Sequence, residues 1–219
     1  MIDPSSLGLT SDRTRARMVR RLQAQGVIDP LVLDAINTIP RHRFIEEALA
    51  SRAYDDVSLP IGFGQTISRP LTVARSCEIA RSGKRLTRVL EIGTGCGYQA
   101  AVLSKIFDQV YSIERISSLL TKARVVLRSL NLRNIHLKHA DGSSGLDSLK
   151  PLDAIVIAAG APELPEQFID LLVTGGRMVV PVGDKTQYLT EVLKLEEGYR
   201  TIRHESVTFV PFLNGVVVK

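Results

Sequence analysis

A glycine loop is the first stretch whose residues could do chemistry. Residues 89–103 read VLEIGTGCGYQAAVL, an apolar strand that runs into glycines at 93, 95 and 97 and then into a helix. Such glycines let the backbone turn sharply and approach a ligand, and the free N–H groups of the helix favour a negative group. A dinucleotide-binding loop needs a third glycine five residues after the first, where this chain has Tyr98. The spacing therefore favours a ligand without a pyrophosphate.

Acidic residues accompany three consecutive predicted strands of this region. Glu91 stands near the end of the first strand, and Glu114 ends the second, 21 residues after Gly93. Asp141 with Gly142 follows the third strand. Ligands of parallel sheets bind at the carboxyl ends of the strands, where Glu91 would suit an amino-acid ammonium, Glu114 a ribose and Asp141 an adenine amine. One such acid is more often a helix cap or a surface charge, but three in succession predict S-adenosylmethionine as the cofactor.

The next strand ends without a side chain that could act as a base. Residues 154–165 read AIVIAAGAPELP, whereas methyltransferases that act on base amines usually place an Asn or Asp followed by Pro-Pro and an aromatic residue there. A carboxylate substrate, with a pKa of about 3.5–4, is ionised at neutral pH and needs no general base. Donors that orient it suffice, and the loop LPIGFGQTISRP at 59–70 supplies Thr66 and Ser68.

A parallel sheet covered by helices is needed to position these groups. Apolar runs predict strands at 88–92, 109–113, 134–139, 152–158, 177–182, 189–195 and 201–210, with helices at 97–107, 116–130 and 165–173. The alternation predicts an α/β fold with a doubly wound, mostly parallel, Rossmann-like sheet with helices on both faces. The short connection at 196–198 predicts an antiparallel edge.

The N-terminal third of the sequence predicts a helical appendage and contains no convincing strand. Helices are expected from Ser11 or Asp12 to about 25, from 30 to before Pro40, and from Pro70. We expect residues 1–84 to form this N-terminal region, with the substrate and cofactor loop at 59–70, and residues 85–219 to form the S-adenosylmethionine-binding domain. The two would make one compact unit.

Composition and charge limit the partners that we expect. The net charge of +5 arises largely from five arginines between Thr10 and Arg21, and the rest of the chain carries only +1, so no nucleic-acid groove is expected. No apolar run is long enough for a membrane span and the N-terminus lacks a leader pattern, which predicts a cytoplasmic location. Two cysteines and four scattered histidines predict neither a disulfide framework nor a metal site. We expect a monomer.

The chain resembles the protein-L-isoaspartate O-methyltransferase family over nearly its whole length. The motifs that carry the resemblance are PRHRFI (40–45), AYDDVSLPIGFGQTIS (53–68), VLEIGTGCGYQAAVL (89–103), VYSIER (110–115), DAIVIAAGAPELP (153–165), GGRMVVPVG (175–183) and VTFVPF (207–212). The loop at 59–68 is the most specific of these, because other methyltransferases share the glycine loop but not that segment. The resemblance implies methylation of the α-carboxylate of L-isoaspartyl residues in damaged proteins and peptides. The ester then collapses to a succinimide that partly reopens to aspartate, with S-adenosyl-L-homocysteine as the other product.

The resemblance also implies roles for individual residues. Ser68 is the active-site serine, to which we assign hydrogen bonding of the substrate carboxylate rather than covalent attack. The residues expected to bind the cofactor are Thr66, Ile67, Glu91, Gly93, Thr94, Gly95, Glu114, Arg115, Asp141 and Gly142. Those expected to contact the substrate are Ser68, Thr66, Ile61, Val207 and Val210. The chain departs from the family pattern at Arg69, at Cys96 and at Ser143-Ser144, and none of these departures removes a group that the reaction needs.

Other functions predict other features. A methyltransferase of the same fold acting on RNA or on a small-molecule hydroxyl would show a basic body surface, or a base or metal cluster at the strand ends. A non-catalytic cofactor-binding protein would have lost the loop at 59–70, which is intact. A nicotinamide oxidoreductase fits the glycine spacing less well.

Overall fold

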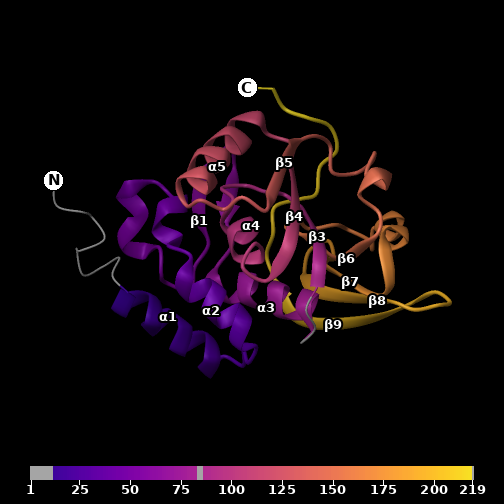
Figure 1. Cartoon of the computed structure of the whole chain (residues 1–219), viewed down its shortest axis with the longest axis horizontal. Coiled ribbons are helices and arrows are strands. Elements are labelled where there is room, and N and C mark those ends of the chain that lie inside the picture. Colours follow the sequence, from indigo (N-terminus) through magenta and orange to yellow (C-terminus); the bar gives the residue numbers. More distant parts are fainter. Residues whose placement is uncertain (1–11, 83–85, 219) are drawn as a thin grey trace.

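A seven-stranded sheet forms the centre of the protein (Figure 1). The computed structural model describes residues 12–82 and 86–218. Ser11, one of the two expected helix starts, and the expected domain boundary at 84/85 lie outside these residues. The strands of the sheet are β3 (Leu86–Ile92), β4 (Phe107–Glu114), β5 (Ile135–His139), β6 (Leu152–Ile157), β7 (Leu172–Val182), β8 (Gln187–Lys194) and β9 (Tyr199–Val207).

The strand order places β3 at the centre of the five parallel strands. The order is β5-β4-β3-β6-β7-β8-β9, with parallel pairing from β5 to β7 and antiparallel pairing for β8 and β9. In register, Ile92 of β3 lies between Ile113 of β4 and Ile157 of β6. After β3 the chain adds β4 and β5 on one side of it and then returns to add β6 and β7 on the other side. At such a reversal of strand order, a doubly wound sheet opens a crevice for a ligand at the carboxyl ends of the strands.

The two faces of the sheet are covered by different kinds of helix. Val89 and Val179 pack in a core cluster with α3 (Pro70–Arg81), α4 (Tyr98–Leu103) and α5 (Ser117–Ser129). Leu90 and Met178, on the other face, pack against Phe168 in a second cluster. That second face carries the 3-10 helices Asp147–Leu149 and Glu166–Leu171. The helix expected at 165–173 is therefore a 3-10 turn that runs into β7, and α4 is shorter than expected.

The N-terminal helices pack against the helical face of the sheet. The first two are α1 (Asp12–Ala24) and α2 (Pro30–Thr38), followed by the 3-10 helices Arg41–Phe44 and Glu47–Arg52. Asp29 caps α2 by accepting hydrogen bonds from the amides of Leu31 and Val32, as its position before Pro30 predicts. Leu22 of α1 belongs to the same core cluster as Val89 of β3. One apolar core is therefore shared between the N-terminal region and the sheet.

Residues 59–67 form a β-hairpin, so the expectation that the N-terminal third has no strand is wrong. β1 (Leu59–Gly62) pairs antiparallel with β2 (Gln65–Ile67). The turn between them is tight, because Gly62, Phe63 and Gly64 all have positive φ. Leu59 and Ile67 are buried while Thr66 is exposed. The hairpin thus fixes one face of the loop in the core and leaves Thr66 free to face a ligand.

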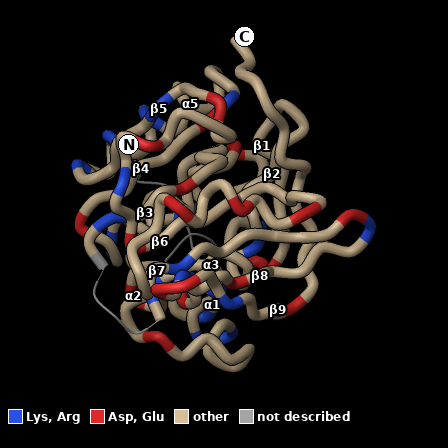
Figure 2. Tube along the Cα trace, turned by 90° about the vertical axis from the view of Figure 1, so that its right-hand side faces the viewer, with Lys and Arg blue, Asp and Glu red and all other residues tan. Residues whose placement is uncertain are grey.

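Basic residues gather on α1 and are otherwise mixed with acidic ones (Figure 2). Among the described residues, no helix is long and apolar enough to cross a membrane. No cluster of three or more His, Cys, Asp or Glu side chains in the described ranges could hold a metal ion.

Candidate active site

A pocket opens at the carboxyl ends of β3, β4 and β6. It has a volume of about 910 Å³, including its open mouth. Its wall is built from the hairpin and the residues after it (Gln65, Thr66, Ile67, Ser68), Val73 of α3, the β3 end and glycine loop (Ile92, Gly93, Thr94, Gly95, Cys96), Tyr98 and Gln99 of α4, the β4 end (Ile113, Glu114, Arg115, Ile116), Gly142, Ala158 and Ala159 after β6, and the C-terminal residues Val210, Pro211, Phe212 and Leu213. Most of the predicted site residues therefore meet in one cavity.

The carboxylate of Glu114 lies in this pocket with both oxygens oriented by the backbone. Its Oε2 accepts a 2.8 Å hydrogen bond from the amide of Gly95, and its Oε1 accepts one of 2.9 Å from the amide of Ile116. The side chain is buried. Because each carboxylate oxygen can accept more than one hydrogen bond, both keep capacity for hydroxyl donors of a ligand. This arrangement fits the ribose that the position of Glu114 predicts.

Glu91, in contrast, does not line the pocket. The prediction that it contacts the cofactor directly is therefore wrong. It lies on the helical side of β3, completely buried, where its Oε2 accepts a hydrogen bond from the Ser112 hydroxyl at 2.5 Å and its Oε1 one from Gln99 Nε2 at 3.1 Å. The reason is the alternation of side chains along a strand, which turns Glu91 away from Ile92, the residue that lines the pocket.

A chain of buried polar groups connects Glu91 to the pocket wall. The hydroxyls of Thr94 and Ser112 lie 2.6 Å apart, and Ser112 donates on to Glu91. Gln99 provides a second link, since it lines the pocket and donates to Glu91. Burial raises the pKa of the Glu91 carboxyl to about 8, against the opposing effect of the hydrogen bonds from Ser112 and Gln99. Through Ser112, Glu91 therefore holds Thr94 of the glycine loop, and at neutral pH its carboxyl is largely protonated.

Asp141 does not belong to the pocket lining, although the next residue does, and its contact with adenine stays a prediction. Its Oδ1 accepts from the amide of Ser143 at 2.8 Å and its Oδ2 from the amide of Gly215 at 2.6 Å. These hydrogen bonds lower the pKa of the Asp141 carboxyl, that from Gly215 most strongly. Gly142 does line the pocket, and a Cβ there would lie 2.4 Å from Cγ2 of Ile92. Only glycine fits at this close approach.

The C-terminal segment crosses the strand ends and forms part of the pocket. Gly160 after β6 exchanges two 2.8 Å backbone hydrogen bonds with it, to Val210 and Phe212. Further along, Val217 is bonded to the backbone on both sides of Ile116. Figure 1 shows this segment in yellow, passing the strands β3 to β5 on its way to the C-terminus. We call residues 209–218 the C-terminal strap.

Arg115 lines the pocket, but its guanidinium is directed to the strap. Nε of Arg115 donates to the carbonyl of Gly215 at 3.0 Å. Together with Asp141, which accepts from the amide of the same residue, Arg115 anchors Gly215 from both of its backbone groups. A contact between Arg115 and the cofactor stays a prediction.

The hydroxyl of Ser68 is at the rim of the pocket. Ser68 is half-buried and follows β2 directly, and within the described part of the chain its hydroxyl has no hydrogen-bond partner. No histidine or lysine is bonded to it, so it is not activated as a nucleophile. It is a hydroxyl donor held at the cavity edge, next to the exposed side chain of Thr66.

Ser68 also belongs to a second hollow, which we call the polar groove. It has a volume of about 1080 Å³, including its open mouth. Its lining consists of Ser58, Ser68, Arg69, Thr72, Lys185, Thr186, Ser206, Val207 and Thr208. Val207, a predicted substrate contact, lies here rather than in the pocket, whereas Val210 lines the pocket as predicted.

Ile61 does not line the pocket, so its predicted substrate contact is corrected. It is buried in the core under the glycine loop, and a Cβ on Gly95 would lie 3.3 Å from its Cδ1. Gly95 itself has a φ of +54°. The alternation of side chains in β1 turns Ile61 inward, so it supports Gly95 from the core side.

Arg41 is a residue of the site that side-chain chemistry in the sequence did not single out. It is completely buried, with its guanidinium carbon 4.7 Å from the centroid of the Tyr98 ring, which lines the pocket. Its Nε donates to the carbonyl of Ala53 at 2.8 Å and its Nη2 to that of Ser68 at 2.7 Å. Burial lowers the pKa of the Arg41 guanidinium, and the nearby Tyr98 opposes this. Arg41 belongs to the motif PRHRFI of the family resemblance, but its neighbours Pro40 and His42 do not indicate that this Arg is buried.

The remaining unpredicted lining residues are mostly apolar and come from segments that the sequence did place near the site. They include Ala158, Ala159 and Phe212. Cys96, a departure from the family pattern, lines the pocket as well. Burial raises the pKa of the Cys96 thiol to about 11, which makes it a packing group rather than a reactive one.

Sequence comparison gives matches along the whole chain. The sequence model of the family described as Protein-L-isoaspartate(D-aspartate) O-methyltransferase matches residues 13–216. The chain is 57% identical over 215 residues to a protein-L-isoaspartate O-methyltransferase of Methylobacillus flagellatus, covering 96% of each chain. It is 55% identical over 215 residues to that of Nitrosomonas eutropha, covering 97% of each.

Comparison with solved structures agrees. A Plasmodium falciparum chain that carries the same enzyme name, solved in complex with S-adenosyl-L-homocysteine, has a TM-score of 0.80 at 26% identity, covering 91% of this chain and 98% of that one. A second structure named protein-L-isoaspartate O-methyltransferase has a TM-score of 0.81 at 28% identity, covering 90% of this chain and 65% of that one.

Proposed function

Because this chain belongs to the protein-L-isoaspartate O-methyltransferase family, we propose that its pocket holds S-adenosylmethionine and that Ser68 orients the α-carboxylate of an isoaspartyl residue. The enzyme methylates L-isoaspartyl residues, with S-adenosylmethionine as the methyl donor.

The pocket fits the three parts of the cofactor. Glu114 has free acceptor capacity for the ribose hydroxyls, and it is already oriented by the amides of Gly95 and Ile116. Gly93 and Gly95 line the pocket with backbone atoms where the methionine part would lie, and Thr94 lies between them. Gly142, after β5, lines the part of the pocket where the adenine ring would lie. When bound, the cofactor supplies a methyl group on a sulfonium, which is electrophilic without a metal or an acid.

The substrate carboxylate requires orientation rather than activation. It is ionised at neutral pH, and the hydroxyls of Ser68 and Thr66 can donate hydrogen bonds to it from the rim of the pocket. Holding the carboxylate oxygen in line and excluding water from it lower the barrier through proximity. Methyl transfer converts this anion to a neutral ester. The peptide nitrogen that follows then attacks the ester carbonyl and methanol leaves, which gives the succinimide without further help from the enzyme.

One observation carries the assignment of Ser68. Its hydroxyl has no partner within the described residues, while its carbonyl is fixed by a buried arginine, at the boundary between the pocket and the polar groove. A residue whose backbone is fixed and whose hydroxyl has no partner is suited to bind a ligand that comes from the groove side. We also propose that Val210 and Val207 contact the substrate near Ser68, and that the enzyme acts as a monomer.

The assignment of the substrate is tested by methyl transfer to two synthetic peptides that differ only in one residue. One contains L-isoaspartate and the other normal L-aspartate at the same position. Label from S-adenosylmethionine, released as base-labile methanol, is expected from the isoaspartyl peptide alone. Label on RNA and on neither peptide would contradict the proposal.

A further inference from the structure

The polar groove next to the pocket has an unusual charge composition. Two cationic side chains, Arg69 and Lys185, line it together with six hydroxyl-bearing residues, and no Asp or Glu belongs to its lining. Hydroxyl groups both donate and accept hydrogen bonds, as a polypeptide backbone requires. Because Ser68 lines both hollows, a polypeptide whose isoaspartyl carboxylate reaches Ser68 lies with one flank in this groove.

Three acidic residues lie near the groove without belonging to its lining. Asp56 accepts a hydrogen bond from the amide of Leu71 at 3.1 Å, and its other oxygen lies 3.9 Å from Arg69 Nη1, too far for a hydrogen bond. Glu205 is bonded to Arg75 at 3.3 Å. Asp184 precedes Lys185 in the chain but does not line the groove. Arg69 is therefore partly balanced by Asp56 behind it, whereas no acidic side chain belongs to the lining of the groove itself.

Both cations are accessible, and one of them is oriented. The side chain of Arg69 is 38% exposed, its Nε donates to Thr72 Oγ1 at 3.1 Å and its Nη1 lies 3.9 Å from Asp56, so the guanidinium is oriented and still accessible to another acceptor. Lys185 is exposed in the turn between β7 and β8 and has no ion-pair partner among the described residues. Arg69 precedes α3 directly, and Lys185 comes from the turn that joins β7 to β8.

We propose that Arg69 and Lys185 make the enzyme prefer isoaspartyl sites with an acidic residue, Asp or Glu, in the flank that lies in the polar groove. This inference rests on the proposed function of the pocket and specifies the substrates of that same site. The preference is modest, because ion pairs at an accessible surface are weak and are screened by salt. Each cation should change kcat/KM by about two- to fivefold.

The experiment uses pairs of isoaspartyl peptides that differ only by Glu or Gln at one neighbouring position, with each position tested in turn. We expect the wild-type enzyme to prefer Glu on one side of the isoaspartate by about two- to fivefold in kcat/KM, and less at high salt. Arg69→Gln and Lys185→Gln should each reduce this preference, and the double variant should abolish it. The Gln peptide should be methylated as before by all of them.

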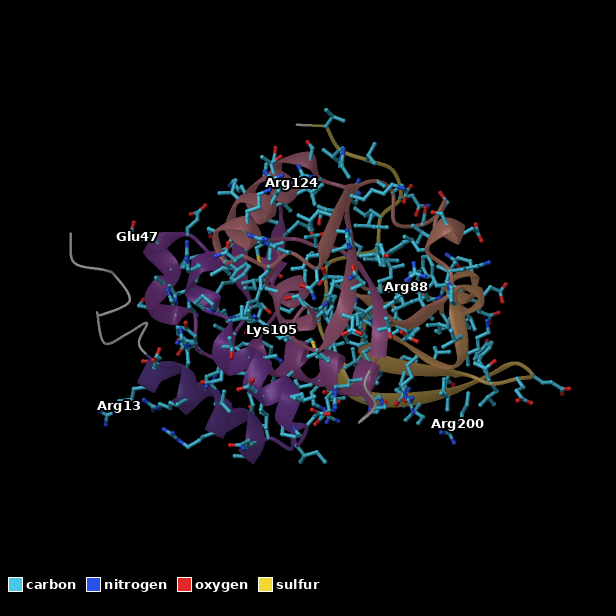
Figure 3. All side chains as sticks on the ribbon, in the orientation of Figure 1. Arg13, Glu47, Arg88, Lys105, Arg124 and Arg200 are labelled. Atoms are coloured by element: carbon cyan, nitrogen blue, oxygen red, sulfur yellow. The ribbon has the colours of Figure 1, made fainter. Side chains whose placement is uncertain are left out.

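Two matched variants control for net charge. Arg200→Gln and Lys105→Gln remove the same charges at exposed positions that line neither hollow (Figure 3). They should keep the Glu preference. Equal kcat/KM for the Glu and Gln peptides in the wild type, or an equal loss of preference in the control variants, overturns this inference alone. Failure of the wild type to methylate any isoaspartyl peptide overturns the proposed function and this inference with it.

Discussion

Nη2 of the buried Arg41 donates a 2.7 Å hydrogen bond to the carbonyl oxygen of Ser68. The same guanidinium donates from Nε to the carbonyl of Ala53 and stacks on Tyr98. Ala53 and Ser68 flank the segment that contains the β1/β2 hairpin, so one side chain fixes both ends of that segment against the pocket wall. The position of the Ser68 hydroxyl therefore depends on a charge buried behind it.

Replacing Arg41 should affect both stability and activity. Arg41→Met leaves the carbonyls of Ala53 and Ser68 unpaired in the interior, which should lower the free energy of unfolding by about 2–5 kcal/mol. Arg41→Lys can replace only one of the two hydrogen bonds and should lie between Met and the wild type. Urea unfolding measures the first effect. Turnover of an isoaspartyl peptide, measured where each variant is fully folded, should also fall, and unchanged turnover in Arg41→Met would show that Ser68 does not need this support.

Glu91 should make stability depend on pH in a particular direction. Its carboxyl has a raised pKa of about 8 when folded, so between the pKa of an unfolded glutamate and about 8 the folded state binds the extra proton. Stability contributed by the neutral acid is therefore complete at low pH and is lost as pH rises through this range. Glu91→Gln, which keeps hydrogen-bonding groups for Ser112 and Gln99, should show a smaller fall in Tm between about pH 5 and pH 8 than the wild type. Parallel Tm curves for the two proteins would contradict the buried, neutral state of Glu91.

The strap should loosen when its acidic anchor is removed. Asp141 accepts from the amides of Ser143 and Gly215, and hydrogen bonds to a charged group are stronger than neutral ones. In Asp141→Ala we expect amide hydrogen exchange in the strap to become about tenfold faster or more. Exchange in α1, which does not touch the strap, provides the internal reference. Equal exchange of the strap in the two proteins would mean that Gly160 and Ile116 hold it without Asp141.

The fold was predictable because its signals are local and repeat along the chain. Each of the seven strands of the sheet was expected within a few residues, since apolar runs and turn residues mark them. The hairpin at 59–67 was missed because β1 and β2 are only four and three residues long, and Gly62 and Gly64 disguise the turn as a flexible loop. The helix expected at 165–173 is present as the 3-10 helix Glu166–Leu171, and its type was not predictable because its apolar residues suit a helix of either pitch.

A site residue could be predicted where its position at a strand end is enough to place it in the pocket. It could not be predicted where the direction of its side chain determines what it contacts. Glu114 lines the pocket as expected. Glu91 and Asp141 also stand at strand ends, but one points to the helical face and the other to the strap. Arg41 could not be placed from the sequence, because its partners are carbonyl groups of residues 12 and 27 positions away. Backbone acceptors of this kind carry no signal in residue type.

The most direct measurement of the proposed site is Ser68→Ala compared with Ser144→Ala, a matched change at an exposed position outside both hollows. Turnover of an isoaspartyl peptide and the affinity for S-adenosyl-L-homocysteine are measured on both variants. If Ser68 donates to the substrate carboxylate, Ser68→Ala should lower kcat/KM by about ten- to a hundredfold while the cofactor Kd changes by less than about twofold. Equal losses of turnover and cofactor affinity, or full turnover in Ser68→Ala, would contradict the assignment of Ser68 to the substrate.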